Sequence, residues 1–160
     1  KPLFSTTDLY NACRKVDRWP GVNHAGTSVR AGAKILKDVG LITEYRWAFN
    51  INEIVMTLLT LGPMVVGTTW YKEMQNPNVH GLIRPRGRAM GGHAYLLNGV
   101  NTDREYFRIK NSWGRQWGDN GHGYISFRDF EKIFKDGGEA CIASEIKINE
   151  VPSLDWIQPI

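Results

Sequence analysis

Residues 91–100 read GGHAYLLNGV and residues 107–124 read FRIKNSWGRQWGDNGHGY, and these two stretches decide the fold. Each contains an apolar run bounded by glycine or asparagine, as is typical of a strand. His93 opens the first strand, and Asn111 closes the second after a tight turn at residues 101–104. A hairpin of this kind lets the side chains of His93 and Asn111 meet.

A histidine that faces an asparagine is typical of a catalytic unit with a thiol nucleophile. A thiol attacks a carbonyl carbon only after a base removes its proton, and an imidazole can pass that proton on near neutral pH. An asparagine oxygen on the far ring nitrogen fixes the tautomer without adding charge. Folding at the turn is expected to bring Ala94 beside Ile109 and Lys110. We therefore interpret His93 and Asn111 as two members of a Cys-His-Asn unit.

Length and composition predict one soluble globular domain with a real core, because 42% of the 160 residues are hydrophobic and 22% are charged. No apolar stretch approaches the roughly 18–20 residues that span a bilayer. Neither a transmembrane helix nor a membrane partner is therefore expected, and no secretory signal peptide is expected at the start.

The net charge of +4 is modest. The arginine-rich run at residues 84–88 could contact phosphate or an acidic substrate or could be a solvated loop, and the loop is favoured. No nucleic-acid motif accompanies it, so no nucleic-acid partner is expected. His24, His80 and His122 are widely separated, no Cys/His pair has metal spacing, and neither a metal nor another cofactor is expected.

The first third of the chain predicts helices and loops. Residues 1–26 are expected to be irregular. Thr27 or Ser28 can cap a helix that ends at Gly40. A second helix is expected to begin after an N-cap at Asn52. The residues that this second helix is expected to bury are Ile54, Val55, Leu58 and Leu59.

The remaining sequence predicts an antiparallel sheet. Residues 71–92 are expected to form a loop and residues 129–135 a short helix. The predicted fold class is α+β, with a helical segment at 1–50, a β-rich segment at 51–150 that carries His93 and Asn111, and an extended tail at 151–160. The predicted strands are residues 64–70, 94–100, 105–110, 122–127 and 142–148.

Several segments resemble the papain-like cysteine peptidases, and they do so in the family's order. NSWGRQWGDNGHGY at residues 111–124 resembles the Asn-Ser-Trp-Gly signature, and GGHAYLLNGV resembles the histidine strand. The stretches PLFSTTDLYNACRK, GTSVRAGAKILKDVGLITEYRWAF and LGPMVVG resemble upstream segments of the same family. The resemblance covers nearly the whole chain, and the Asn-Ser-Trp-Gly block with an upstream Gly-His is specific.

The resemblance implies a role for each residue of the motif. His93 would be the general base and acid, and Asn111 would orient its ring. Trp113 would shield the hydrogen bond between them from water, with Trp117 packed close by.

The resemblance also implies a papain-like architecture. Residues 1–50 would be a remnant of the helical left subdomain, and residues 51–150 would be the β-rich right subdomain. Gly26 and Thr27 would lie on the rim of the cleft that binds a peptide or protein substrate.

One part of the family's catalytic unit is not found in these residues. In relatives the nucleophile lies roughly 130–150 residues before the histidine, which here is upstream of Lys1, as is the glutamine of the oxyanion hole. Cys13 and Cys141, free or bridged, align with structural cysteines, so neither is expected to be the nucleophile. A preceding segment or a partner chain is expected to supply both groups, and the isolated chain is expected to be inactive.

Three functions remain open on the sequence. The leading hypothesis is peptide-bond hydrolysis by a cysteine-type peptidase. The alternative is a non-catalytic, papain-like structural or binding component of a larger assembly. An acyltransferase that uses the same catalytic unit is the third.

Overall fold

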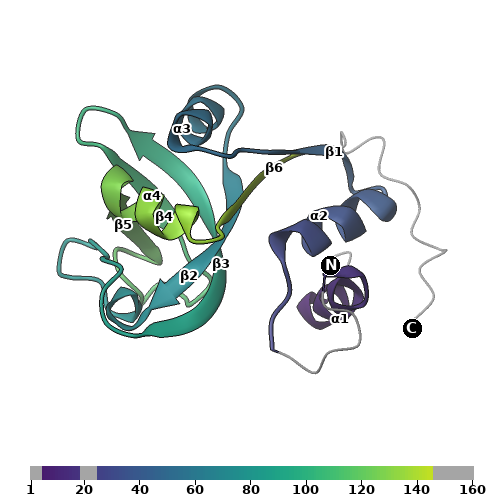
Figure 1. Cartoon of the computed structure of the whole chain (residues 1–160), viewed down its shortest axis with the longest axis horizontal. Helices are drawn as coiled ribbons and strands as arrows, with labels where there is room; N and C mark the ends of the chain where they lie inside the picture. The colour runs from purple at the N-terminus through teal and green to yellow at the C-terminus, as the bar shows by residue number, and fades with distance from the viewer. Residues whose placement is uncertain (1–4, 19–24, 146–160) are drawn as a thin grey trace. The chain divides into compact units, whose positions relative to one another are not determined.

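The computed structural model describes residues 5–18 and 25–145, and the chain divides into two compact units. Unit 1 contains residues 1–46 and 143–160, and unit 2 contains residues 47–142. Figure 1 labels the α-helices and the strands. In chain order the elements are α1 (Thr6–Val16), α2 (Val29–Asp38), β1 (Ile42–Trp47), α3 (Ile51–Thr60), β2 (Met64–Tyr71), η1 (Lys72–Gln75), β3 (Ala89–Asn101), β4 (Tyr106–Lys110), β5 (His122–Ser126), α4 (Phe127–Lys135) and β6 (Glu139–Glu145).

In unit 1 the helices α1 and α2 pack against each other (Figure 1). The predicted helix after Ser28 is confirmed as α2, because the Ser28 hydroxyl accepts a hydrogen bond from the Ala31 N–H at 3.1 Å. Gly40 follows the helix with a φ of 71°, a backbone conformation that glycine adopts without steric cost.

The prediction that residues 1–26 are irregular is wrong for α1. Ser5 caps this helix by accepting a hydrogen bond from the Asp8 N–H at 3.1 Å. Basic residues in the last turn, Arg14 and Lys15, suit the helix dipole. The apolar pattern is weak because Cys13 is the one buried residue among those of α1, so the cap was the stronger signal.

The predicted start of the second helix is also wrong, because α3 begins after Asn50 rather than Asn52. The Asn50 side chain accepts a hydrogen bond from the Glu53 N–H at 3.0 Å, and the Glu53 carboxylate accepts one from the Phe49 N–H at 2.7 Å. Ile54 is buried as predicted, whereas Leu59 is 58% exposed.

Within the described residues, six strands form one sheet in the order β1-β6-β2-β3-β4-β5. The pairs β2–β3, β2–β6, β3–β4 and β4–β5 are antiparallel, and the predicted α+β class is confirmed. The strand β1 was not expected, because Glu44 and Arg46 interrupt its apolar pattern and its burial does not alternate cleanly.

Two other boundaries differ from prediction. The strand β3 begins at Ala89, and η1 occupies part of the expected loop at 71–92. The strand β6 begins at Glu139 rather than at residue 142. His24 and the predicted tail at 151–160 lie outside the described residues. The predicted division of the chain into segments 1–50, 51–150 and 151–160 remains a prediction.

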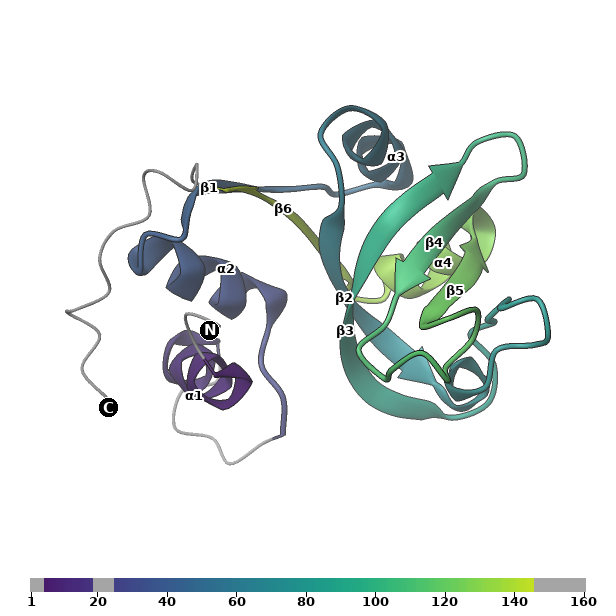
Figure 2. The same ribbon diagram turned by 180° about the vertical axis from the view of Figure 1, so that it is seen from behind.

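The core of unit 2 lies between its curved sheet and α4, which Figures 1 and 2 show against one face of strands β2 to β5. Ser126 caps α4 by accepting a hydrogen bond from Asp129, and the helix buries Phe130, Ile133 and Phe134. No helix within residues 5–18 or 25–145 is long and apolar enough to cross a bilayer.

Candidate active site

The alternation of side chains along the sheet sets the position of His93. On β3, Tyr95 and Leu97 are buried, so His93 lies on the same, inner face of the strand. Its partner across the β2–β3 ladder is Thr68, which is also buried. His93 itself is half-buried, because it lies at the edge of the core: the residues before it on β3 are exposed, and Tyr95 and Leu97 after it are buried.

Asn111 reaches His93 from the end of β4, by a register that differs from the predicted one. Lys110 is paired with Leu96 and not with Ala94, because the register between β3 and β4 shifts between Leu97 and Gly99. The side chains nevertheless meet, and Asn111 is buried at 7% exposure.

A single hydrogen bond links the two side chains, with 2.9 Å between His93 Nε2 and Asn111 Oδ1. The same oxygen accepts a hydrogen bond from the Ser112 N–H at 2.8 Å, which fixes the orientation of the amide because only the oxygen can accept. His93 Nε2 must therefore carry the proton, and in the neutral ring Nδ1 is left with a lone pair. An imidazole held in this way can accept a proton at Nδ1.

The segment that follows Asn111 is a tight loop that returns the chain to β5. The Asn111 N–H donates to the Gly121 carbonyl at 3.0 Å, which closes the loop. At Gly123 an added Cβ would lie 2.7 Å from the Trp117 ring, and at Gly118 it would collide with the His122 carbonyl. Glycine at these two positions is therefore required for the loop to bring Trp117 against the sheet.

Aromatic rings surround His93, and we call Trp70, Tyr95, Trp113 and Trp117 the aromatic cluster. The centroid of the His93 ring lies 4.7 Å from that of Trp70, 4.8 Å from that of Trp113 and 6.0 Å from that of Tyr95. Trp113 is 42% exposed, whereas Trp70 is 3% exposed.

The ring of Trp117 packs against the rings of Trp70 and Trp113, which in turn pack against His93. Its ring centroid is 6.0 Å from that of Trp113 and 6.2 Å from that of Trp70. Its indole N–H donates to the Gln75 carbonyl at 3.0 Å, so it joins the loop to η1. The structure thus brings four residues singled out in the sequence into one cluster, namely His93, Asn111, Trp113 and Trp117.

Two members of the aromatic cluster were missed in the sequence. Trp70 and Tyr95 read as ordinary strand residues. The register of β2 against β3 reveals that Trp70 faces the histidine, and the alternation along β3 places Tyr95 on the same face as His93. The hydroxyls of Tyr95 and Thr68 are hydrogen-bonded at 3.0 Å. Burial raises the pKa of Tyr95, so the phenol remains protonated and neutral near His93.

Gly26 and Thr27 belong to unit 1, and their place on a substrate cleft remains a prediction. The Gly26 N–H donates to the Tyr10 hydroxyl at 2.9 Å, and its φ of 101° favours glycine. The Thr27 hydroxyl donates to the Asp17 carboxylate at 3.2 Å.

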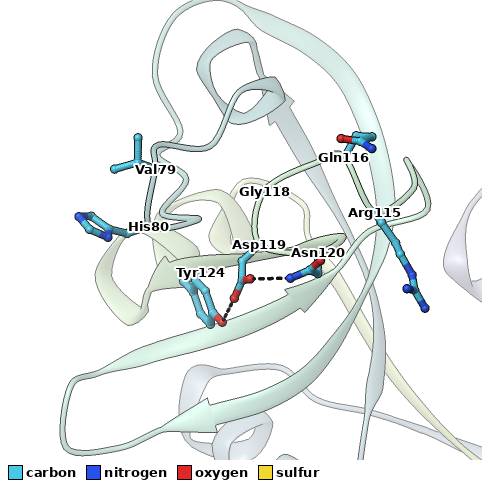
Figure 3. Close-up of a pocket in the computed structure, with 8 residues that line it drawn as sticks. All are labelled: Val79, His80, Arg115, Gln116, Gly118, Asp119, Asn120 and Tyr124. Carbon is cyan, nitrogen blue, oxygen red and sulfur yellow. Dashed lines mark hydrogen bonds between the residues drawn. The ribbon is translucent and has the colours of Figure 1, made fainter.

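A second polar feature of unit 2 is an open cavity of about 520 Å³ that contains neither His93 nor Asn111 (Figure 3). In Figure 3 the Tyr124 hydroxyl donates to the Asp119 carboxylate at 2.9 Å, and this hydrogen bond raises the pKa of Tyr124. Among the described residues no group of three His, Cys, Asp or Glu side chains is arranged to hold a metal. The lining residues are Val79, His80, Arg115, Gln116, Gly118, Asp119, Asn120 and Tyr124.

Cys13 and Cys141 are both free and buried. Burial raises the pKa of Cys13, and the Asp17 carboxylate raises it further. Burial, with a contribution from Glu139, raises the pKa of Cys141 to about 11. A reactive thiol requires the opposite environment, one that is electropositive and partly exposed. Neither cysteine therefore has the surroundings of a nucleophile.

The raised pKa of Cys141 predicts a loss of stability in alkaline solution. The folded chain holds the thiol proton up to a pH of about 11, whereas the unfolded chain releases it near pH 9.0. Unfolding therefore releases a proton in this window, and the free energy of unfolding falls as the pH rises through it. The expected loss is about 2 kcal/mol between pH 9 and pH 11, measured by urea denaturation.

Cys141→Ala is the matched control for this prediction, because alanine has no proton to release and fits the buried site. Its free energy of unfolding should fall less than that of the wild type over the same pH window. Identical pH dependence in the two proteins would contradict the raised pKa.

Comparison with known proteins assigns the family. The sequence profile described as "Papain family cysteine protease" matches residues 20–146, which is most of the chain. The chain therefore belongs to the papain family of cysteine proteases, as its motifs predicted.

The curated relatives match over part of their length. Cathepsin B-like cysteine proteinase 4 of Caenorhabditis elegans is 28% identical over 82 residues, which are 50% of this chain and 24% of the relative. A cysteine proteinase of Theileria annulata is 38% identical over 74 residues, which are 44% of this chain and 17% of the relative. The matched regions thus span about a quarter or less of these two relatives.

Solved structures confirm the papain-like fold. Xylellain, a cysteine protease from Xylella fastidiosa, superimposes with a TM-score of 0.68 at 19% identity, covering 87% of this chain and 69% of xylellain. The Carica candamarcensis cysteine protease CMS1MS2, solved in complex with E-64, gives a TM-score of 0.50 at 16% identity, covering 66% of this chain and 50% of that protein.

Proposed function

We propose that the chain contributes His93 and Asn111 to the active site of a papain-like cysteine peptidase, in which a segment upstream of residue 1 supplies the cysteine nucleophile. The observation that carries this proposal is the 2.9 Å hydrogen bond from His93 Nε2 to Asn111 Oδ1, which leaves Nδ1 as the basic nitrogen. The buried thiols of Cys13 and Cys141, whose pKa values are raised, support a nucleophile from elsewhere.

In the proposed reaction His93 Nδ1 accepts the thiol proton, and the thiolate attacks the carbonyl carbon of the substrate peptide bond. The imidazolium then donates this proton to the leaving amine, and a thioester remains. The imidazole next takes a proton from water, which hydrolyses the thioester and releases the carboxylic acid product and the thiol. The Asn111 carboxamide keeps the imidazole in one tautomer and stabilises it when it becomes charged.

The proposed substrate is a peptide or protein, bound in an extended form by the continuous protein. The term "continuous protein" means this chain together with the residues encoded immediately upstream of Lys1 in the same reading frame. The same upstream region is proposed to supply the glutamine donor of the oxyanion hole. Loss of one such donor typically lowers kcat by about 100- to 1000-fold, so the segment is needed for more than the thiol.

The test is covalent labelling of the continuous protein with E-64, the compound bound in the CMS1MS2 structure. The expected result is one adduct, located by peptide mapping on a cysteine that precedes residue 1. The 160-residue chain alone, treated in the same way, should remain unlabelled because both of its thiols are buried and hold their protons.

Other results would count against the proposal in identifiable ways. An upstream region without cysteine, or a folded continuous protein that E-64 does not label, would favour a non-catalytic binding component. An adduct on Cys13 or Cys141 would show that the nucleophile had been misassigned. Labelling without hydrolysis of any peptide would favour an acyltransferase.

A further inference from the structure

Trp70 lies on the inner face of β2, two residues after Thr68, which is paired with His93. Thr68 is paired with His93, so Trp70 is its diagonal neighbour, at a separation that a large aromatic side chain can bridge. The residue directly opposite Trp70 is Gly91, which has no side chain to compete for the space. The indole can therefore lie against the imidazole, in an edge-to-face arrangement with an interplanar angle of 64°.

The rings of Trp70, Trp113 and His93 form a triangle. The two indole centroids are 5.6 Å apart, and the imidazole centroid lies 4.7 Å from that of Trp70 and 4.8 Å from that of Trp113. Trp113 is on the loop and 42% exposed, whereas Trp70 is on a strand and 3% exposed. Trp70 is therefore held more firmly in place than Trp113.

The hydrogen bond to Asn111 does not by itself fix the imidazole. It holds the Nε2 atom, but the ring can still turn about the axis through that bond, and Nδ1 would then point away from an incoming thiol. A second contact, on the flank of the ring, is needed to fix the direction of Nδ1. Trp70 supplies such a contact from inside the core.

We propose that Trp70 is a positioning residue for His93, which keeps the imidazole hydrogen-bonded to Asn111 with Nδ1 directed outward. This inference rests on the proposed function, because the direction of Nδ1 matters only if His93 serves as a base. It adds a residue from β2 to a site otherwise built on the hairpin of β3 and β4. The indole N–H of Trp70 is buried without a hydrogen-bond partner among the described residues, so ring packing, and not a polar contact, fixes its place there.

The experiment is nitrogen NMR of the chain with ¹⁵N-labelled histidine, at a pH where the imidazole is neutral. The ¹⁵N shifts report the tautomer, and the exchange of the Nε2 proton with water reports how often the bond to Asn111 opens. In Trp70→Met an unbranched apolar side chain still fills part of the buried site, but the ring is lost. The expected result is a two- to tenfold rise in exchange, about the range of one aromatic contact, with a measurable fraction of the other tautomer.

Two further variants make the result specific. Trp70→Phe retains a ring and should restore exchange to near the wild-type rate. Trp117→Met is the matched control, because Trp117 belongs to the same aromatic cluster but its ring packs against Trp70 and Trp113. Its His93 signals should keep the wild-type tautomer. Thermal unfolding of each variant separates a local change at His93 from a general loss of stability.

The wild-type chain provides a measurement that no folding defect can compromise. Nuclear Overhauser effects between the His93 ring protons and the Trp70 indole should be present, and their absence would overturn the proposal. So would a folded Trp70→Met variant with wild-type exchange and tautomer. A wild-type His93 without a proton on Nε2 would instead contradict the His93–Asn111 geometry and with it the proposed function.

Discussion

Replacing His93 by alanine in the continuous protein is expected to lower kcat/KM for peptide hydrolysis by about 100- to 10,000-fold, the usual contribution of a general acid and base. The variant lacks the Nδ1 atom that would take the thiol proton, so only the small fraction of thiolate present without a base could react. The measurement is steady-state hydrolysis of a fluorogenic peptide, together with the rate of E-64 labelling.

His80→Ala is the matched control for this prediction. His80 lines the open cavity in Figure 3, and neither His93 nor Asn111 contributes to that cavity. Its kcat/KM should stay within about a factor of two of the wild type, which corresponds to less than about 0.5 kcal/mol. If the two histidine variants lost activity equally, the base would not be His93.

Replacing Phe107 by alanine is expected to lower the free energy of unfolding by about 3–5 kcal/mol, the usual cost of removing a buried phenylalanine. Phe107 is fully buried at the centre of unit 2, and its ring centroid lies 4.5 Å from that of Phe127 and 5.0 Å from that of Phe130. Truncation would leave a cavity between β4 and α4 that these rings cannot fill. Urea denaturation followed by circular dichroism provides the measurement.

Phe49→Ala makes the same chemical change at a site that is 78% exposed. Its free energy of unfolding should change by less than about 0.5 kcal/mol. A loss of under 1 kcal/mol for Phe107→Ala, by the same order-of-magnitude standard, would mean that this core is not packed as described.

The features that the sequence predicted correctly are those coded by nearby residues. The helix after Ser28 has its own cap and its own glycine stop, and the strands around His93 and Asn111 alternate or are continuously apolar. The position of Asn111 beside His93 followed from one short turn, so an error in the exact register did not separate the two side chains.

The features that the sequence did not predict depend on contacts between distant residues. The strand β1 carries Glu44 and Arg46, and it is a strand because its neighbour in the sheet is β6, about a hundred residues later. The cap of helix α3 was missed although its contacts are local: the Asn50 side chain accepts a hydrogen bond from the Glu53 N–H, and the Glu53 carboxylate accepts one from the Phe49 N–H.

The place of Trp70 beside His93 needs the pairing of two strands that a long connection separates. Such pairings are set by tertiary packing and are not visible in a local pattern. Tyr95 is a different case, because it lies two residues after His93 on the same strand and the alternation along β3 alone places both on one face.

The hairpin of β3 and β4 encodes His93 and Asn111 only 18 positions apart. The contacts described around His93 come from β2, from this hairpin and from the loop after Asn111, so they all lie after the start of β2 in one continuous segment. The orientation of the imidazole is therefore encoded in one continuous stretch of the chain.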